Sequence, residues 1–472
     1  MTPFQQFRLW VRRAPNTQRV PAGIAVLVVV GLLIWVIVPS GGSGGSTTSN
    51  PTGATVAAYP STPPSPAPKP SSCTNPSGTL TGVTSSQIKL GVIVVNITGL
   101  ASNAQFGILP VTQQKAGFQA IINAINTSGG VDCRQIVPDF ITANPADTSD
   151  LQQVCLKVVS DGDFAAVDSG AFAAFPIVDC FGEHRVPYFG GYLLPASEMN
   201  KFYPYLFELN SVDTVYHDTI AGLVRLGFFK PANGYQKLGV LYQDCHPEIH
   251  AETTKWLAEA GVPASTIVNF DVGCPSAFTS SVVLEQAILK FKKAGVTNMT
   301  EFGGVGDFPT FTKLAQAQNF RPKYGLPDDS LITTSYGTQA PDAQNIANAY
   351  AITASRDGEE RTPGMTQTPA SVTCSNLLGT SVYKLPAAAG NACDQMWMFA
   401  AAVDHAPTLS RESLAGGLKA AGSVIFSYPQ GPNDFAIGNK VTYGGQYWRT
   451  TQFHESCQCW QVIDQTFRPS AQ

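Results

Sequence analysis

The sequence has little charge and few of the motifs that mark enzymes. Only 13% of its 472 residues are charged, and 29 basic against 33 acidic residues leave a net charge of −4. This balance offers no basic surface for nucleic acid. Outside a glycine- and serine-rich stretch, the chain contains no G-x-S-x-G elbow, P-loop or dinucleotide-binding glycine fingerprint. We therefore expect a protein that is not an enzyme and needs no cofactor.

One long uncharged apolar run lies near the N-terminus, at residues 20–38. Nineteen helical residues at about 1.5 Å each nearly cross a bilayer core of roughly 30 Å. The basic tail that precedes the run, 1–19, contains Arg8, Arg12, Arg13 and Arg19. This order is typical of a single-pass signal anchor in the cell membrane with an extracytoplasmic C-terminal module. A cleaved secretion signal is the alternative, although the run is long for one.

A linker and a set of cysteines follow the apolar run. Residues 39–80 are mostly Gly, Ser, Thr, Pro and Ala, which is typical of a tether. Ten cysteines in an oxidising compartment predict disulfides. The pairs closest in sequence are Cys155–Cys180, Cys245–Cys274 and Cys374–Cys393. That leaves Cys73, Cys133, Cys457 and Cys459 to be shared out, and zinc at the last two would lack a second nearby ligand pair.

The stretch 88–134 predicts the unit from which a parallel α/β sheet is built. A β-branched run, Ile88–Val95, is typical of a strand buried on both faces. A polar loop leads to a helix with apolar spacing over 116–125, which Gly129 and Gly130 end. The next strand is expected at 135–141. In such sheets ligands bind at the carboxyl ends of the strands.

The same alternation continues along the chain. We expect further strands at 164–167, 188–192, 237–242, 266–272, 297–302, 331–336 and 350–355, and in the tail 440–461. We expect further helices at 150–159, 215–226, 249–260, 284–294, 309–318, 392–405 and 411–421. Another helix is expected to run through Phe181. The Thr-, Pro- and Gly-rich segment 356–391 is expected to be irregular.

Several of these segments resemble one known family. The loop Asn96–Gly107, the helix that ends in Ile125-Asn126-Thr127-Ser128-Gly129-Gly130, and the strand that ends in Phe302-Gly303-Gly304 are similar to those of leucine/isoleucine/valine-binding proteins. These are substrate-binding proteins of ABC transporters for amino acid transport, with the type I periplasmic-binding fold. The resemblance covers about Thr84 to Ile463.

The resemblance implies an α/β fold of two Rossmann-like lobes joined by three crossovers, preceded here by the transmembrane helix. Lobe one would comprise 84–208 and 355–425, and lobe two 209–354 and 426–465. It also implies a small-molecule ligand, amino-acid-like or another small organic solute, captured between the lobes, and an ABC permease as partner.

Candidate ligand-binding residues lie in the loops after the strands. They are Ser102, Phe106, Ser169, Gly170, Ala171, Phe172, Gly191, Tyr192, Tyr242, Asp244, Gly304, Asp307 and Tyr336. Backbone N–H groups of 169–172 suit an anion at a helix start. Asp244 and Asp307 suit a ligand ammonium, and equally the cap of the helix that follows each. Ordinary turn and packing roles are the alternative for the whole set.

The sequence departs from the family at two loops. Gly190-Gly191-Tyr192-Leu193 replaces a segment rich in Ser and Thr, and Gln243-Asp244-Cys245-His246-Pro247 replaces D-x-x-Y-G. A more apolar and aromatic cleft is therefore expected. His246 and His250 are spaced for zinc on one helix face, but Pro247 predicts that the helix begins between them. Two alternatives to transport stay open: a ligand-sensing receptor module of the same fold, and a surface scaffold without a ligand.

Overall fold

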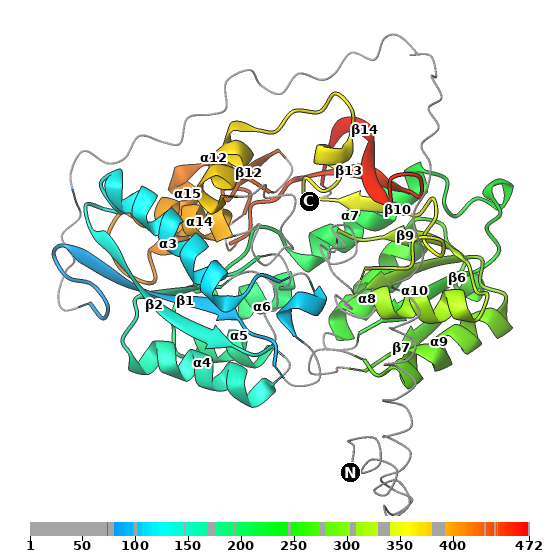
Figure 1. The fold of residues 1–472 in the computed structure, drawn as a ribbon, viewed down its shortest axis with the longest axis horizontal. Helices are drawn as coiled ribbons and strands as arrows, with labels where there is room; N and C mark the ends of the chain where they lie inside the picture. Colours follow the sequence, from blue (N-terminus) through cyan, green and yellow to red (C-terminus); the bar gives the residue numbers. More distant parts are fainter. Residues whose placement is uncertain are drawn as a thin grey trace, which may run out of the picture. The chain divides into compact units, whose positions relative to one another are not determined.

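The computed structural model describes Cys73 and most of residues 80–470 (Figure 1). Within that range the description leaves out 99–101, 107, 146, 169–174, 192–193, 244–246, 274–278, 303–307, 329–339, 380–391, 429–430, 439 and 441. Residues 1–55 and 56–472 are separate units, and every element below belongs to the second.

The first sheet is five-stranded and parallel, in the order β2-β1-β3-β4-β5. Its strands are β1 (Gln87–Val95), β2 (Gln135–Ala143), β3 (Ala165–Asp168), β4 (Tyr188–Phe189) and β5 (Leu206–Phe207). β1 is buried continuously from Leu90 to Val95, because helices cover both faces of the sheet.

Alternate residues of β1 pack against different helices. Leu90, Val92 and Val94 belong to one core with α3 (Val111–Thr127) and α14 (Ala392–Asp404). Ile93 belongs to another with α4 (Thr148–Ser160) and α5 (Phe175–Glu183). This is the period of two that a strand requires. The remaining helices of this part are α6 (Ala196–Lys201), α12 (Pro369–Leu378) and α15 (Leu414–Ala421).

The second sheet is seven-stranded, in the order β14-β13-β10-β9-β8-β6-β7. Its parallel strands are β6 (Leu238–Tyr242), β7 (Ile267–Asp271), β8 (Asn298–Phe302), β9 (Lys323–Leu326) and β10 (Tyr350–Thr353). β13 (Tyr447–His454) and β14 (Cys459–Pro469) extend it antiparallel. β11 (Ser423–Ile425) and β12 (Pro432–Asp434) form a separate two-stranded sheet.

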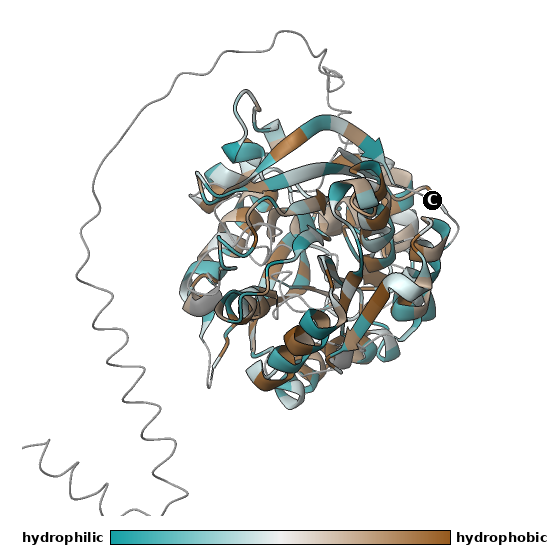
Figure 2. Ribbon diagram, turned by 90° about the vertical axis from the view of Figure 1, so that its right-hand side faces the viewer, coloured by the Kyte–Doolittle hydropathy of each residue, from teal (hydrophilic) through white to brown (hydrophobic). Residues whose placement is uncertain are grey.

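Helices also cover both faces of the second sheet. α7 (Val212–Arg225) and α8 (Pro247–Glu259) share one core with its strands, while α9 (Ser281–Ala294) and α10 (Phe308–Ala317) share the other. The helices carry both hydrophobic and hydrophilic residues, as one-sided burial requires (Figure 2).

The chain visits each sheet more than once. It forms β1 to β5, passes to β6 to β10, returns with α14 and α15 to the core of the first sheet, and leaves again for β13 and β14. The predicted α/β fold with three crossovers is therefore confirmed. In the described part of the chain no helix has the length and apolar character to span a membrane, and the run 20–38 lies outside that part.

The sequence prediction was wrong at three places. β4 ends at Phe189, earlier than expected. β9 was missed because it is short and follows an Arg-Pro pair, while the predicted strand 331–336 lies outside the described residues. The supposedly irregular segment 356–391 contains α12. That helix has a typical N-terminus: the Thr368 side chain accepts a hydrogen bond from the Ser371 N–H, and Pro369 is the first helical residue.

Two predicted disulfides, Cys155–Cys180 and Cys374–Cys393, are confirmed. Both cysteines of Cys245–Cys274 lie outside the described residues. The cysteines that the sequence left unassigned pair as Cys73–Cys133 and Cys457–Cys459.

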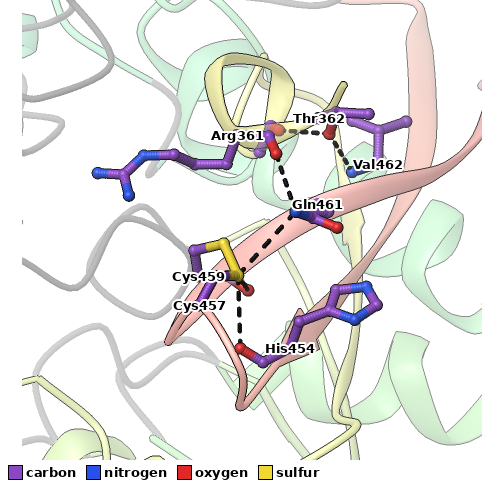
Figure 3. The surroundings of a disulfide bond; sticks show 8 residues. Arg361, Thr362, His454, Cys457, Cys459, Gln461 and Val462 are labelled. Atoms are coloured by element: carbon purple, nitrogen blue, oxygen red, sulfur yellow. Dashed lines mark hydrogen bonds between the residues drawn. A yellow bond between two sulfur atoms is a disulfide. The ribbon is translucent and has the colours of Figure 1, made fainter. Parts of the chain in front are cut away.

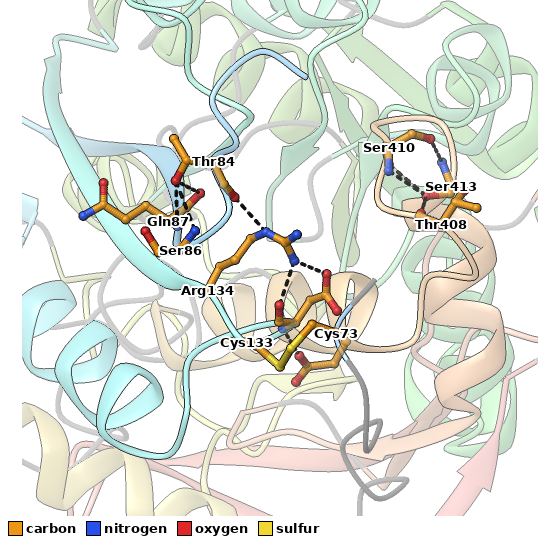
Figure 4. A network of polar contacts seen from close by, with 11 residues as sticks. Cys73, Thr84, Ser86, Gln87, Cys133, Arg134, Thr408, Ser410 and Ser413 are labelled. Atoms are coloured by element: carbon orange, nitrogen blue, oxygen red, sulfur yellow. Dashed lines mark hydrogen bonds and ion pairs between the residues drawn. A yellow bond between two sulfur atoms is a disulfide. The ribbon is translucent and has the colours of Figure 1, made fainter. Parts of the chain in front are cut away.

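A disulfide joins Cys73, near the end of the linker, to Cys133 in a tight turn before β2 (Figure 4). Asp132 and Cys133 have φ values of 43° and 60°, a left-handed conformation that costs non-glycine residues about 1–2 kcal/mol each. Arg134 offsets this cost, since its guanidinium contacts the Asp132 carboxylate and donates to the Asp132 and Thr84 carbonyls at 2.8 and 2.9 Å. The disulfide to Cys73 then ties the linker to this turn.

The contact between α14 and α15 depends on one glycine, and it generates a prediction. A Cβ at Gly417 would lie 1.9 Å from the Ala402 carbonyl oxygen, whereas a Cβ at exposed Gly416 would meet nothing within 4 Å. We expect Gly417→Ala to destabilise the protein by about 1–3 kcal/mol through overpacking. Gly416→Ala, the matched control, should stabilise it by roughly 0.5–1 kcal/mol. Urea unfolding of both variants measures this, and equal stabilities would contradict the assigned packing.

A buried carboxyl group generates a pH prediction. Asp394 in α14 is fully buried and accepts the N–H groups of Ser427 and Tyr428 at 2.6 and 2.9 Å. Burial raises its pKa from 3.8 to about 7, against the opposing effect of those hydrogen bonds. The folded state therefore binds this proton more tightly than the unfolded state does. The contribution of Asp394 to stability is largest below about pH 4 and decreases as the pH rises to about 7.

We expect Asp394→Asn to remove this dependence. Between pH 4 and pH 7, the free energy of unfolding of the wild type should fall relative to that of the variant, by an amount on the order of a few kcal/mol. Parallel urea titrations at several pH values provide the measurement. A difference between the two proteins that stays constant with pH would show that the pKa of Asp394 is not raised.

Candidate ligand-binding site

Strands of the first sheet end together at one edge. β1, β3, β4 and β5 are parallel, so their carboxyl ends meet there. The last residues of these strands are Val95, Asp168, Phe189 and Phe207. Small molecules bind outside such ends in open α/β sheets. We therefore build the candidate site from this edge.

Two amide side chains hold the loop that follows β1. Gln114 accepts the Val95 N–H at 2.9 Å and donates to the Val95 carbonyl at 2.7 Å. Asn103 donates to the same carbonyl at 2.9 Å. Both amides also donate to the Leu109 carbonyl, at 2.7 and 3.0 Å. These bonds satisfy backbone groups of Val95 and Leu109, and so they attach the loop to the sheet edge.

Asp168 at the end of β3 is buried and bonded from two elements. The Tyr188 hydroxyl of β4 donates to one carboxylate oxygen, and the Gln395 amide of α14 lies 3.5 Å from the other. Burial, together with the negative charges of Asp168 and Glu208, raises the pKa of Tyr188 well above its usual value. The phenol therefore stays protonated and donates at neutral pH. Asp168 directly precedes the predicted ligand loop 169–172, which lies outside the described residues.

Glu208 brings a second buried carboxyl group to this edge. A Cβ at Gly190 would lie 2.3 Å from its Oε1 atom and 3.0 Å from the ring of Tyr188. A side chain at position 190 would therefore have to displace the Glu208 carboxylate, and glycine leaves it in place. The Glu208 N–H donates to the Thr442 carbonyl at 3.0 Å, which joins the edge to a segment that leads into β13.

Segments that pass between the sheets hydrogen-bond to one another beside this edge. The Leu209 carbonyl accepts the N–H groups of Gly444 and Gly445 at 3.3 and 2.8 Å. The Leu209 N–H donates to the Gly191 carbonyl at 2.6 Å. A Cβ at Gly445 would lie 2.7 Å from the Asn210 side chain, so this close approach also needs glycine. The strand end at Gly191 is thus bonded directly to the crossing backbone.

The corresponding edge of the second sheet is more aromatic. Tyr242 ends β6, is 2% exposed, and stacks on His250 of α8 with ring centroids 3.9 Å apart. Its hydroxyl lies 3.1 Å from the Thr253 hydroxyl, and burial raises its pKa. Tyr242 therefore packs among the residues of α8. His250 Nε2 lies 3.4 Å from Asn269, and α8 begins at Pro247 as predicted.

Short helix α6 of the first part contacts α7 and α8 of the second. The Ala196 N–H donates to Asp213 at 2.6 Å, and the Ser197 hydroxyl donates to Glu248 at 2.9 Å. Partial burial and the neighbouring Asp213 and Glu248 raise the pKa of Glu252 to about 7. These contacts join the layers of the two sheets through neutral donors and carboxylates.

The predicted site residues divide into three groups. Ser102 is exposed, and it precedes the 3-10 helix η1 (Asn103–Phe106), which Phe106 ends on the loop held by Asn103 and Gln114. Gly191 is buried two residues after the end of β4, and Tyr242 is buried at the end of β6. The residues outside the described part of the chain are Ser169, Gly170, Ala171, Phe172, Tyr192, Asp244, Gly304, Asp307 and Tyr336.

Sequence reasoning missed the buried polar groups of the edge. Asp168 is the last residue of the buried strand β3 and Glu208 directly follows β5, and these positions were the available signal. No sequence spacing indicated the amide roles of Asn103, Gln114 and Gln395, because their partners are defined only by the folded chain.

The comparisons with known proteins agree with this architecture. A family model described as periplasmic binding protein matches residues 87–451. The branched-chain amino acid transporter substrate-binding protein LivJ of Streptococcus pneumoniae, solved with isoleucine, has a TM-score of 0.58 and 17% identity. The match covers 80% of this chain and 99% of LivJ. A solute-binding protein of an ABC transporter from Rhodopseudomonas palustris BisB5, solved with 3,4-dihydroxybenzoic acid, has a TM-score of 0.57 and 16% identity over 82% of this chain and 98% of its own.

An extracellular ligand-binding receptor from Verminephrobacter eiseniae has a TM-score of 0.55 and 16% identity, over 80% of this chain and all of its own. No curated protein matches the chain significantly. At these identities the solved structures establish the fold, while the family model covers most of the chain. The family consists of binding proteins, so the chain is not an enzyme. The chain belongs to the periplasmic binding protein family, and its architecture is the type I fold of the leucine/isoleucine/valine-binding proteins.

Proposed function

We propose that the chain is an extracytoplasmic solute-binding protein that captures a small organic molecule for an ABC importer. The observation that carries this proposal is the edge of the first sheet. There the loop after β1, the residue before loop 169–172, and Gly191 are each fixed by buried side chains or by the crossing backbone. A preorganised edge lowers the entropy cost of holding a ligand.

Capture between two lobes requires that the ligand touch both of them. We propose lobe one as 84–208 plus 355–425 and lobe two as 209–354 plus 426–465. The ligand would first bind the loop with Ser102 and Phe106, and the loops of lobe two would then close over it. The α6 contacts with Asp213 and Glu248 already join the layers of the two sheets, so they provide one place where the lobes meet.

The N-terminal segments supply the location in this proposal. The uncharged run 20–38 acts as the membrane anchor, and 39–80 acts as the tether that lets the binding module reach a permease. The disulfides Cys155–Cys180 and Cys374–Cys393 support an oxidising, extracytoplasmic compartment.

The proteins of similar fold suggest which ligands to test. Those solved with isoleucine and with 3,4-dihydroxybenzoic acid bind an amino acid and an aromatic acid. The described edges add buried carboxyl groups at Asp168 and Glu208 and an aromatic ring at Tyr242. Amino acids, amides, aromatic acids and short peptides therefore form the first ligand panel.

The proposal predicts a thermal shift with a member of this panel. Residues 73–472, produced under oxidising conditions, should unfold at a higher temperature when the ligand is present. A ligand at one hundred times its Kd stabilises the native state by about 2.7 kcal/mol. The ligand-induced shift should disappear in Phe106→Ala and Asp307→Asn. It should persist in Val282→Ala, which replaces an exposed residue of α9.

Each outcome of this screen has a definite meaning. A shift that is lost only in the two site variants supports a solute-binding protein and identifies the chemical class of its ligand. A shift that survives in both variants places binding elsewhere on the chain. An intact fold with no shift across the panel argues against solute capture and favours the scaffold.

A further inference from the structure

The disulfide between Cys457 and Cys459 differs from the other described disulfides in the loop it closes. Its sequence separation is 2, against 60, 25 and 19 for the others. A disulfide stabilises a fold mainly by restricting the unfolded chain, and this effect decreases as the closed loop becomes shorter. Among the described disulfides, Cys457–Cys459 therefore contributes least to the stability of the fold.

The hairpin that carries this disulfide is held by other contacts. Phe453 and Trp460 pair across β13 and β14, with ring centroids 5.5 Å apart. Beside the turn, the Val462 N–H donates to the Thr362 hydroxyl at 2.7 Å, so the strand is fastened to a second segment (Figure 3). Opening the sulfur–sulfur bond would leave this pairing in place.

One of the two cysteines, Cys457, is also open to attack from solvent. Cys457 lies in the exposed turn 455–458, while Cys459 is 8% exposed at the start of β14. Cys374 and Cys393 are both fully buried, and so is Cys155, whereas Cys73 and Cys133 are exposed. Accessibility therefore separates Cys457–Cys459 from the two buried pairs, and its shorter closed loop separates it from Cys73–Cys133. Accessible disulfides are the ones that exchange with incoming thiolates.

The turn itself favours opening and stabilises the product. Gln458, between the two cysteines, has φ +49°, a left-handed conformation that is unfavourable for a non-glycine residue. The amide nitrogen of Gln461 lies 4.0 Å from Cys457 Sγ and is held in place by its bond to the Arg361 carbonyl at 2.9 Å (Figure 3). An amide N–H beside a sulfur stabilises the thiolate form once the bond is broken.

We propose that Cys457–Cys459 is a redox-active disulfide that exchanges with dithiols, separately from ligand binding. A dithiol thiolate attacks Cys457 Sγ and forms a mixed disulfide. The sulfur–sulfur bond breaks, and its electron pair leaves on Cys459 Sγ, which takes a proton from water. The second thiol of the reagent loses its proton and attacks the mixed disulfide, which releases Cys457 as a thiolate. The protein gains two electrons, and the dithiol becomes a disulfide.

The experiment titrates the full native chain with dithiothreitol, blocks free thiols by alkylation, and maps the modified cysteines by peptide mass spectrometry. We expect Cys457 and Cys459 to be half-reduced at a dithiothreitol concentration at least about tenfold lower than any other described pair requires. Circular dichroism should be unchanged at that concentration. Reduction of this pair together with any other described pair, or after it, would overturn the proposal.

Paired serine variants provide the control. Cys457→Ser with Cys459→Ser should remove the earliest alkylation step and leave the thermal midpoint nearly unchanged. Cys374→Ser with Cys393→Ser should keep that early step and lower the midpoint clearly. If the first double variant unfolds, the disulfide is structural and the proposal is wrong. The titration of the wild-type chain tests the proposal even if neither variant folds.

Discussion

Two of the three segments that pass between the sheets meet at one carbonyl group. Leu209 accepts hydrogen bonds from both Gly444 and Gly445, and Glu208 donates to Thr442 beside them. Backbone groups at a buried crossing must find partners, and each crossing segment supplies those of the other. Asn210 occupies the space that a side chain at position 445 would need, so the approach is open to glycine alone. This contact defines where segments more than 230 residues apart run together.

The candidate site is built directly onto this crossing. Gly191 bonds to Leu209, and Glu208 lies against Gly190, so the end of β4 and the crossing backbone form one connected structure. Asp168 joins it through Tyr188. A ligand that rearranged the loop after Asp168 would therefore act on groups that also contact the crossing segments. If the chain captures a ligand as proposed, this connection would be a physical route from ligand contact to lobe closure.

The fold was largely predictable because its strands are apolar runs that glycine-ended helices separate. β9 escaped because four residues, Lys323–Leu326, are too short to show a period, and their place in the sheet comes from two neighbouring strands. α12 escaped because its composition resembles a loop, although Thr368 and Pro369 mark a helix start. Of the site, the sequence located the strand ends. It could not pair Asp168 with Gln395, since 227 residues separate them and only folding brings them together.

Two buried carboxyl groups lower the stability of the folded protein at neutral pH. Asp394 of α14 is buried against the segment at Ser427. Asp163 is buried as well, with its Oδ1 atom 3.1 Å from Lys89 Nζ. Burial raises the pKa of Asp394 to about 7 and that of Asp163 to about 6, so both groups favour the folded state less once they are ionised. Apolar side chains of equal volume would avoid this cost, but they would leave the N–H groups of Ser427 and Tyr428 without acceptors. Asp394 thus lowers stability at neutral pH but fixes the backbone at Ser427 and Tyr428. The Tyr428 carbonyl in turn accepts the Arg356 N–H at 2.8 Å, where the chain returns from β10.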